Sequence, residues 1–130
     1  MLQWTIDGIP LSINRTYAVR AVKVKGKYIG QMYKTQAARD YEHYLGLQVR
    51  LAHAQSNWQI PPKNVALELV ITITPKDLRA DVDGGVKINM DTVSKALDFN
   101  DRQIRRVIVE ALEPDKLNPH THFILRELQR

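Results

Sequence analysis

One run in the chain alternates so regularly that it restricts the type of fold around it. From Val65 to Thr74 every second residue is a large aliphatic one, and most residues between them are small or polar. Side chains of a β-strand point alternately to opposite faces of the sheet, so this period of two predicts a strand with one face in the core. Pro75 ends the run, because proline cannot donate to the hydrogen-bond ladder of a sheet. The predicted core positions are Val65, Leu67, Leu69, Ile71 and Ile73.

The segments before this strand predict another strand, a hairpin and a helix. Residues 2–7 alternate between apolar and polar side chains, which is typical of a half-buried strand. Valines and lysines alternate over residues 22–25 before a turn at Gly26, which indicates a basic hairpin or an extended loop. Thr35 suits the N-cap of a helix over residues 36–56. Its apolar stripe contains Ala38, Tyr41, Leu45, Leu51 and Ala52.

The segments after the strand predict a second helix, from about Asp83 to Leu97, and two more strands, over residues 102–112 and 121–128. A chain of 130 residues is long enough for one hydrophobic core and needs no second domain. We therefore predict a single α+β domain over residues 1–130, with a mixed β-sheet and two main helices packed on it. The expected inward positions of the 102–112 strand are Ile104, Ile108 and Leu112.

Composition excludes several classes of protein. No apolar run approaches the roughly 20 residues that span a bilayer, so we expect no membrane-bound protein. The chain has no cysteine, which excludes disulfides and thiolate metal sites. Its first ten residues lack the charged start and apolar centre of a signal peptide. These features favour the cytoplasm.

The positive charge is concentrated in one segment. The net charge is +5, yet no acid stands between Asp7 and Asp40. Lysines and arginines can replace the counterions condensed on nucleic acid, so this segment is a candidate phosphate-contacting surface, with a generic basic protein as the alternative. Its Tyr17, Tyr28 and Tyr33 are expected to pack rather than to stack on bases. The candidate DNA contacts are Arg15, Arg20, Lys23, Lys25, Lys27 and Lys34, and Arg79 further on.

A group of acids follows the strand of residues 65–74. On extended chain, Asp81 and Asp83 would project to the same side with Cα atoms about 7 Å apart, near enough to share a cation. A hard cation such as Mg²⁺ prefers carboxylate oxygens and relieves the repulsion between them. On a helical wheel Lys87 and Asp91 continue the line of Asp83, and Asp101 is expected to fold back toward it. The wheel places Val86, Met90, Val93 and Leu97 on the buried face.

This arrangement suits phosphodiester hydrolysis, in which carboxylates hold one or two metal ions and a lysine offsets charge in the transition state. Each acid also has a structural explanation. Asp83 could cap the helix near the positive end of its dipole, and Lys87 with Asp91 is an ordinary surface pair one turn apart. Spacing alone leaves both interpretations open.

The run from Asp81 to Ile104 resembles the signature of the RusA family of Holliday junction resolvases, endonucleases of bacteria and their prophages. The family pattern is Asp-x-Asp, a lysine four residues on, an Asp four beyond it in a helix, and a last Asp followed by x-Gln and an aliphatic residue. The segments 10–17 and 34–41 resemble the family's N-terminal segment and the start of its first helix. The matching positions are Asp81, Asp83, Lys87, Asp91, Asp101, Gln103 and Ile104.

The resemblance implies a homodimeric, Mg²⁺-dependent endodeoxyribonuclease, with Mn²⁺ as an alternative metal, that nicks opposed strands of a four-way junction in DNA recombination and repair. Asp81, Asp83 and Asp101 would hold the metal. Lys87 would assist catalysis or hold a phosphate, and Asp91 would support the site from outside the metal's own ligands. Asn14, beside Arg15 in the matched N-terminal segment, joins the expected DNA contacts.

Two departures from the family pattern bear on these expectations. Gly84 and Gly85 follow the second Asp, where the family often has Asn, and the spacing to Asp101 is shorter by one residue. Glycine weakens a helix, so Val86 is an alternative first residue. Two other functions stay open: a DNA-junction-binding module without catalysis and, ranked lower, a metal-dependent nucleotidyltransferase, although no glycine-serine phosphate loop precedes the acid pair.

Overall fold

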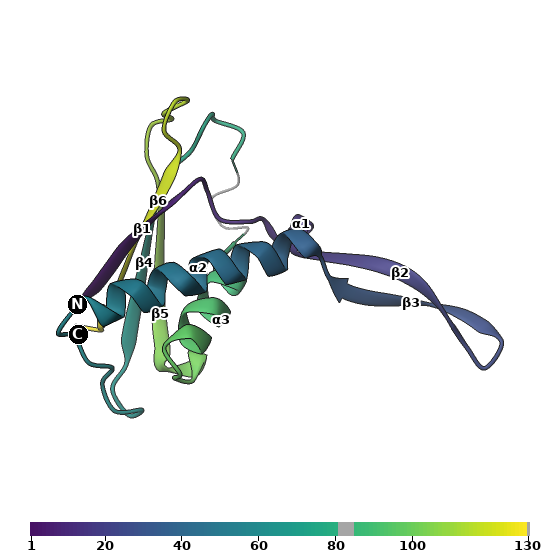
Figure 1. Cartoon of the computed structure of the whole chain (residues 1–130), viewed down its shortest axis with the longest axis horizontal. Coiled ribbons are helices and arrows are strands. Elements are labelled where there is room, and N and C mark those ends of the chain that lie inside the picture. Colours follow the sequence, from purple (N-terminus) through teal and green to yellow (C-terminus); the bar gives the residue numbers. More distant parts are fainter. Residues whose placement is uncertain (81–84, 130) are drawn as a thin grey trace.

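A four-stranded mixed sheet is the centre of the molecule (Figure 1). The structure, a computed structural model, describes residues 1–80 and 85–129. The strand order is β1-β6-β4-β5, in which β4 and β5 are parallel and the other neighbours antiparallel. The elements are β1 (Leu2–Asp7), α1 (Ile13–Thr16), β2 (Tyr17–Val24), β3 (Lys27–Lys34), α2 (Gln36–Ala54), β4 (Leu67–Thr74), α3 (Val86–Ala96), the 3-10 turn η1 (Asp101–Gln103), β5 (Ile104–Ala111) and β6 (His120–Glu127).

The two long helices, α2 and α3, lie against one face of this sheet (Figure 1). The predicted α+β architecture with a mixed sheet is therefore confirmed. The β4 run carries the core as predicted, although the strand begins at Leu67, two residues later than expected. No helix in the described part of the chain is long and apolar enough to cross a membrane. The core between sheet and helices contains Trp4, Leu45, Val49, Leu67, Leu69, Ile71, Val93, Leu97, Phe123 and Leu125.

The predicted inward face of β5 is wrong after its first residue. Ile104 is buried, but Ile108 is 39% exposed and Leu112 46% exposed. The pairing of β4 with β5 shifts by one residue after Ile104, which is the effect of a β-bulge. The shift moves the inward positions from even to odd numbers, so that Val107 and Val109 pack on the core instead.

The helical wheels are only partly right. In α2, Leu51 is 47% exposed, while Val49 takes its place in the core. In α3, Val93 and Leu97 are buried as predicted, but Val86 is only half-buried and Ile88 is buried. The reason is that α3 packs against both the sheet and α2, so its buried arc is wider than one stripe.

The strands β2 and β3 form a hairpin of their own, which we call the arm (residues 17–34). It pairs with no strand of the main sheet and extends away from the body of the molecule (Figure 1). The basic hairpin is therefore confirmed, while the single turn α1 before it was not predicted. The expectation that the tyrosines pack is wrong for Tyr28, which is 73% exposed.

The helix α3 has well-defined ends. It begins at Val86 with Gly85 as its N-cap, which is the alternative start predicted from the glycines, while Asp83 lies outside the described residues. At the other end, Asp98 takes a left-handed conformation (φ 57°), and the N–H of Phe99 donates to the Ser94 carbonyl at 2.9 Å. This is a Schellman-type stop, which turns the chain back along the helix.

The face of the sheet away from α2 and α3 carries a charged ladder. Glu68 on β4 is almost fully buried, and its carboxylate accepts hydrogen bonds from Arg106 of β5 at 3.1 Å and Arg126 of β6 at 3.3 Å. The Arg106 guanidinium, together with that of Arg126, holds the pKa of Glu68 below its ordinary value despite the burial. The ladder joins three neighbouring strands.

Candidate functional site

Two carboxylates meet beside the helix α3. Asp91 projects from the middle of α3, and the stop at Asp98 brings the chain back so that Asp101, in η1, lies beside it. Burial raises the pKa of Asp91, and the neighbouring Asp101 carboxyl raises it further, while the nearby Lys87 opposes the shift. Asp101 therefore folds back toward α3 as expected, and the acid beside it there is Asp91.

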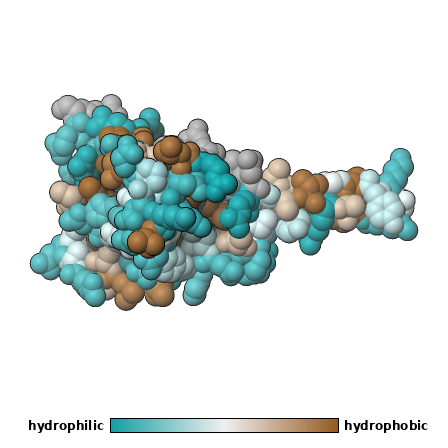
Figure 2. All heavy atoms as spheres, turned by 90° about the horizontal axis from the view of Figure 1, so that it is seen from above, coloured by the Kyte–Doolittle hydropathy of each residue, from teal (hydrophilic) through white to brown (hydrophobic). Residues whose placement is uncertain are grey.

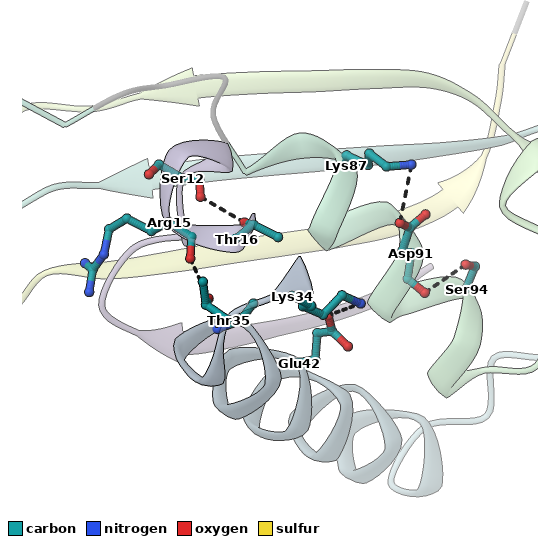
Figure 3. A network of polar contacts seen from close by, with 10 residues as sticks. Ser12, Arg15, Thr16, Lys34, Thr35, Glu42, Lys87, Asp91 and Ser94 are labelled. Carbon is teal, nitrogen blue, oxygen red and sulfur yellow. Dashed lines mark hydrogen bonds and ion pairs between the residues drawn. The ribbon is translucent and has the colours of Figure 1, made fainter. Parts of the chain in front are cut away.

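Lysines flank this acid pair on both sides. The Nζ of Lys87 lies 3.8 Å from a carboxylate oxygen of Asp91, one helical turn away (Figure 3). Lys34, at the base of the arm, lies 2.6 Å from the carboxylate of Glu42 on α2. The bond to Glu42 raises the pKa of Lys34, so the ammonium stays charged near Asp91. The acids therefore lie where the arm, α2 and α3 come together.

A groove of about 560 Å³ runs between α2 and α3 from this point. Asp91, Lys34 and Glu42 line one part of it. The other charged side chains in its lining are cations, and they form no ion pair with any of the described residues. Such a lining attracts a polyanion. These further cations are Arg39 and Arg50 of α2 and Lys95 of α3, with His43 beside them.

Small residues let the two helices approach each other under this groove. A Cβ at Gly46 would lie 3.9 Å from Cγ2 of Thr92 and 4.0 Å from Cβ of Ala96, which is ordinary contact. The Thr92 hydroxyl is buried here and has no hydrogen-bond partner among the residues described. The helices are thus close at the floor, and long basic side chains form the walls.

The first turn of α3 is held in place by two contacts. Tyr41 of α2 donates a hydrogen bond from its hydroxyl to Oδ1 of the buried Asn89 at 2.5 Å, and burial raises the pKa of Tyr41. Gly85 lies so close to the loop after β1 that a Cβ there would be 2.6 Å from Cβ of Pro10. The N-terminal segment and α2 therefore both fix the position from which α3 starts.

The structure brings together only some of the predicted site residues. Asp81 and Asp83 lie outside the described residues, and so does the side chain of Asn14. Lys87, Asp91 and Asp101 do come together.

The predicted DNA contacts fall into separate groups. Arg20, Lys23, Lys25 and Lys27 lie on the arm, and Lys34 lies at its base. Arg15 is exposed on α1, and its guanidinium points away from Asp91 (Figure 3). Arg79 is bound to its near neighbour Asp77 at 2.8 Å, so part of its charge is already offset.

Lys34 and Asp91 were predicted site residues, but the other residues of the groove were not. Arg39, His43, Gly46 and Arg50 recur at helical spacing along α2, which is the signal that would have grouped them. That signal does not identify α3 as the opposite wall, because only the tertiary packing places Lys95 there.

The chemistry of the acid pair fits a hard divalent cation. No group of three or more His, Cys, Asp or Glu side chains in residues 1–80 and 85–129 is arranged to hold a metal ion. Asp91 and Asp101 nevertheless supply two adjoining carboxylates, which are the ligands that Mg²⁺ prefers, and Mg²⁺ commonly takes only one or two from a protein. Asp91, expected to stand behind the metal ligands, is thus as well placed as Asp101.

Comparisons with known proteins add little to this geometry. No protein-family model matches the chain, and no curated protein matches it either. Among solved structures, 2C-methyl-D-erythritol 2,4-cyclodiphosphate synthase from Plasmodium vivax aligns with a TM-score of 0.36 and 10% sequence identity, over 98% of this chain and 97% of that one. A likeness this weak supports no statement about the activity of this chain.

Proposed function

We propose that the chain is a Mg²⁺-dependent, structure-specific endodeoxyribonuclease that resolves four-way DNA junctions by paired nicks. The observation that carries the proposal is the meeting of Asp91 and Asp101 at a groove lined by cations that form no ion pair with residues 1–80 and 85–129. Carboxylates that can hold a metal next to cations that can hold phosphates are the two parts that phosphodiester hydrolysis requires. The resemblance of residues 81–104 to the RusA signature includes both acids, with Asp101 as a metal ligand and Asp91 in support, and implies the same reaction.

The chain's own side chains would divide the work. A phosphodiester strand lying in the groove would contact Arg39, Arg50 and Lys95, which fixes the scissile phosphate beside Asp91 and Asp101. Mg²⁺ bound by these carboxylates, and by Asp81 and Asp83, would supply Lewis-acid catalysis and an activated water. Lys87 would then offset the negative charge that develops on the phosphate.

The rest of the proposal concerns assembly and location. Two catalytic centres are needed for symmetric nicks, so a twofold homodimer would match the twofold symmetry of a junction. Contacts to phosphates carry little sequence information, so branch shape would dominate recognition. The proposed nuclease would act on DNA in the cytoplasm, in recombination and repair.

The test is incubation of purified protein with a synthetic four-way junction, a forked DNA and a linear duplex, each in Mg²⁺ and in EDTA. The proposal expects metal-dependent nicks at symmetric positions in the junction. Junction binding that ignores Mg²⁺, with no nicks, would instead support the binding module without catalysis. Equal cutting of linear duplex would indicate a general nuclease.

Variants of Asp81 and Asp83 separate catalysis from binding. Asp81→Asn and Asp83→Asn should abolish cleavage and retain junction binding, because removing negative charge does not weaken contacts to phosphates. Loss of binding in both variants would show that these acids support the fold.

A further inference from the structure

The arm exposes apolar side chains on both of its faces. In register, Val19 pairs with Met32, and their exposed fractions are 68% and 67%. On the other face Ile29 is 51% exposed. Figure 2 shows brown, hydrophobic residues along the projecting arm. A two-stranded hairpin alone is marginally stable in water, so such an arm gains stability from a partner that covers it.

Cations stand beside these apolar residues on each face. The guanidinium of Arg20 lies 5.1 Å from the ring centre of Tyr33, and the ammonium of Lys23 lies 6.0 Å from that of Tyr28. The arm contains no acid. A second copy of this chain would bring its own positive arm and a body whose cations and acids balance, whereas a polyanion complements the arm. Charge therefore favours nucleic acid as the partner.

The tip of the arm also carries charge at a conformational cost. Lys25 and Gly26 form a two-residue turn with positive φ at both positions, 50° and 80°. Asparagine and glycine are the usual residues in such a turn, and a left-handed conformation costs other residues about 1 kcal/mol. A lysine here places a positive charge at the point of the arm that lies farthest along both strands.

The dimensions of the arm suit the major groove of DNA. Each strand has 8 residues, so the arm reaches about 26 Å. Two strands lie about 5 Å apart before their side chains are added, and the roughly 12 Å wide major groove of B-DNA admits such a ribbon more readily than the roughly 6 Å minor groove. Apolar side chains there can contact thymine methyl groups.

We propose that the arm is a β-ribbon that lies in the major groove of one duplex branch of the DNA substrate. The proposal rests on DNA as the substrate of the proposed function, but it needs no cleavage. Cations of the ribbon contact the phosphates on either side, and Val19 and Met32 face the base edges. The ribbon thus holds a duplex at a fixed distance from the groove between α2 and α3.

The test measures binding to linear duplex and to a junction in EDTA, together with dimethyl sulfate protection of guanine N7, which lies in the major groove. An arm-shortened protein joins Ala18 to Tyr33 through Asn-Gly in place of residues 19–32, because this pair lies an even number of steps from Val24–Lys27, the pair that closes the natural two-residue turn. We expect protection of guanine N7 by the wild type and its loss in the shortened protein. The segment removed carries Arg20, Lys23, Lys25 and Lys27. The salt dependence of log affinity should therefore decrease by up to about 3.6, since about 0.9 is lost for each phosphate contact removed.

A second variant tests the apolar contacts with the charge unchanged. Val19→Thr with Met32→Thr keeps strong strand formers, and duplex affinity should fall about fivefold to tenfold from the lost apolar contact. Leu117→Thr, at a site that is 95% exposed and outside the arm, should bind like the wild type.

Several outcomes would overturn the proposal. Equal duplex affinity of the shortened protein would do so, and so would competition by the minor-groove ligand distamycin. Conversion of a dimer to a monomer by the arm variants, with DNA binding unchanged, would assign the arm to a second copy of the chain. Failure of the nuclease proposal would give a different result: the protein would make no nicks in Mg²⁺ but would still protect guanine N7.

Discussion

Substitution of Gly85 by alanine tests the contact that positions the start of α3. The added Cβ would lie 2.6 Å from Cβ of Pro10 and 3.0 Å from the carbonyl oxygen of Leu11. Carbon atoms in contact normally lie about 3.5 to 4.0 Å apart, so the loop or the helix must move by about 1 Å. The backbone itself is no obstacle, because the φ of Gly85 is −108°.

Two effects of this substitution oppose each other. Alanine reduces the entropy of the unfolded chain, which stabilises by about 0.4 to 1 kcal/mol. Overpacking against a fixed loop costs about 1 to 3 kcal/mol. The contact at Gly85 involves a proline ring and a backbone oxygen rather than the end of a flexible side chain, so the steric cost should dominate. We expect a net loss of about 1 to 2 kcal/mol in the free energy of unfolding.

Equilibrium unfolding in urea, followed by the fluorescence of Trp4 and Trp58, measures this change. Gly46→Ala is the matched control, because its Cβ would meet only ordinary contacts, the nearest being Nη1 of Arg50 at 3.5 Å. In a helix interior this control should stabilise by up to about 1 kcal/mol. A Gly85→Ala protein as stable as the wild type would refute the close packing of the N-terminal loop on α3.

Three further predictions concern the hydrogen bond between Tyr41 and Asn89, the charged ladder at Glu68 and the groove between α2 and α3. Tyr41→Phe leaves the buried Oδ1 of Asn89 without its donor and should cost about 1 to 3 kcal/mol in urea unfolding. Because the folded pKa of Glu68 is below its ordinary 4.5, the stability it provides is present above that pH and is lost as pH falls below it; Glu68→Gln should flatten this part of a stability–pH curve. Arg50→Gln and Lys95→Gln should each lower the salt dependence of log DNA affinity by about 0.9, measured by fluorescence anisotropy, with an unchanged circular dichroism spectrum.

Local patterns predicted those parts of the fold whose determinants are local. The β1 run alternates without interruption, and Leu67, Leu69, Ile71 and Ile73 of β4 are buried as their spacing predicted. The Thr35 hydroxyl accepts a hydrogen bond from the backbone N–H of Ala38, as an N-cap should. The alternation of β5 failed because a bulge depends on the partner strand. The start of α3 at Val86 followed from the weak helix propensity of two glycines.

The candidate site was only partly predictable for the same reason. That Asp101 folds back follows from its place just beyond a helix, and the left-handed Asp98 is the residue that makes the turn. That Asp91 is its neighbour, and that Arg50 and Lys95 face one groove, depends on how α2 packs on α3. Nothing in the sequence indicates that residues on two different helices, far apart along the chain, face the same groove.

The central claim is that the acid pair serves Mg²⁺-dependent cleavage, and nicking of a four-way junction by wild type, Asp101→Asn and Asp98→Asn tests it most directly. Asp98 is a suitable control, because asparagine tolerates its left-handed conformation. We predict symmetric nicks by the wild type and by Asp98→Asn in Mg²⁺ but not in EDTA. The Asp101→Asn protein should bind the junction and cleave at least about a hundredfold more slowly. Cleavage by Asp101→Asn at the wild-type rate, or no Mg²⁺-dependent nick by the wild type, would contradict the account.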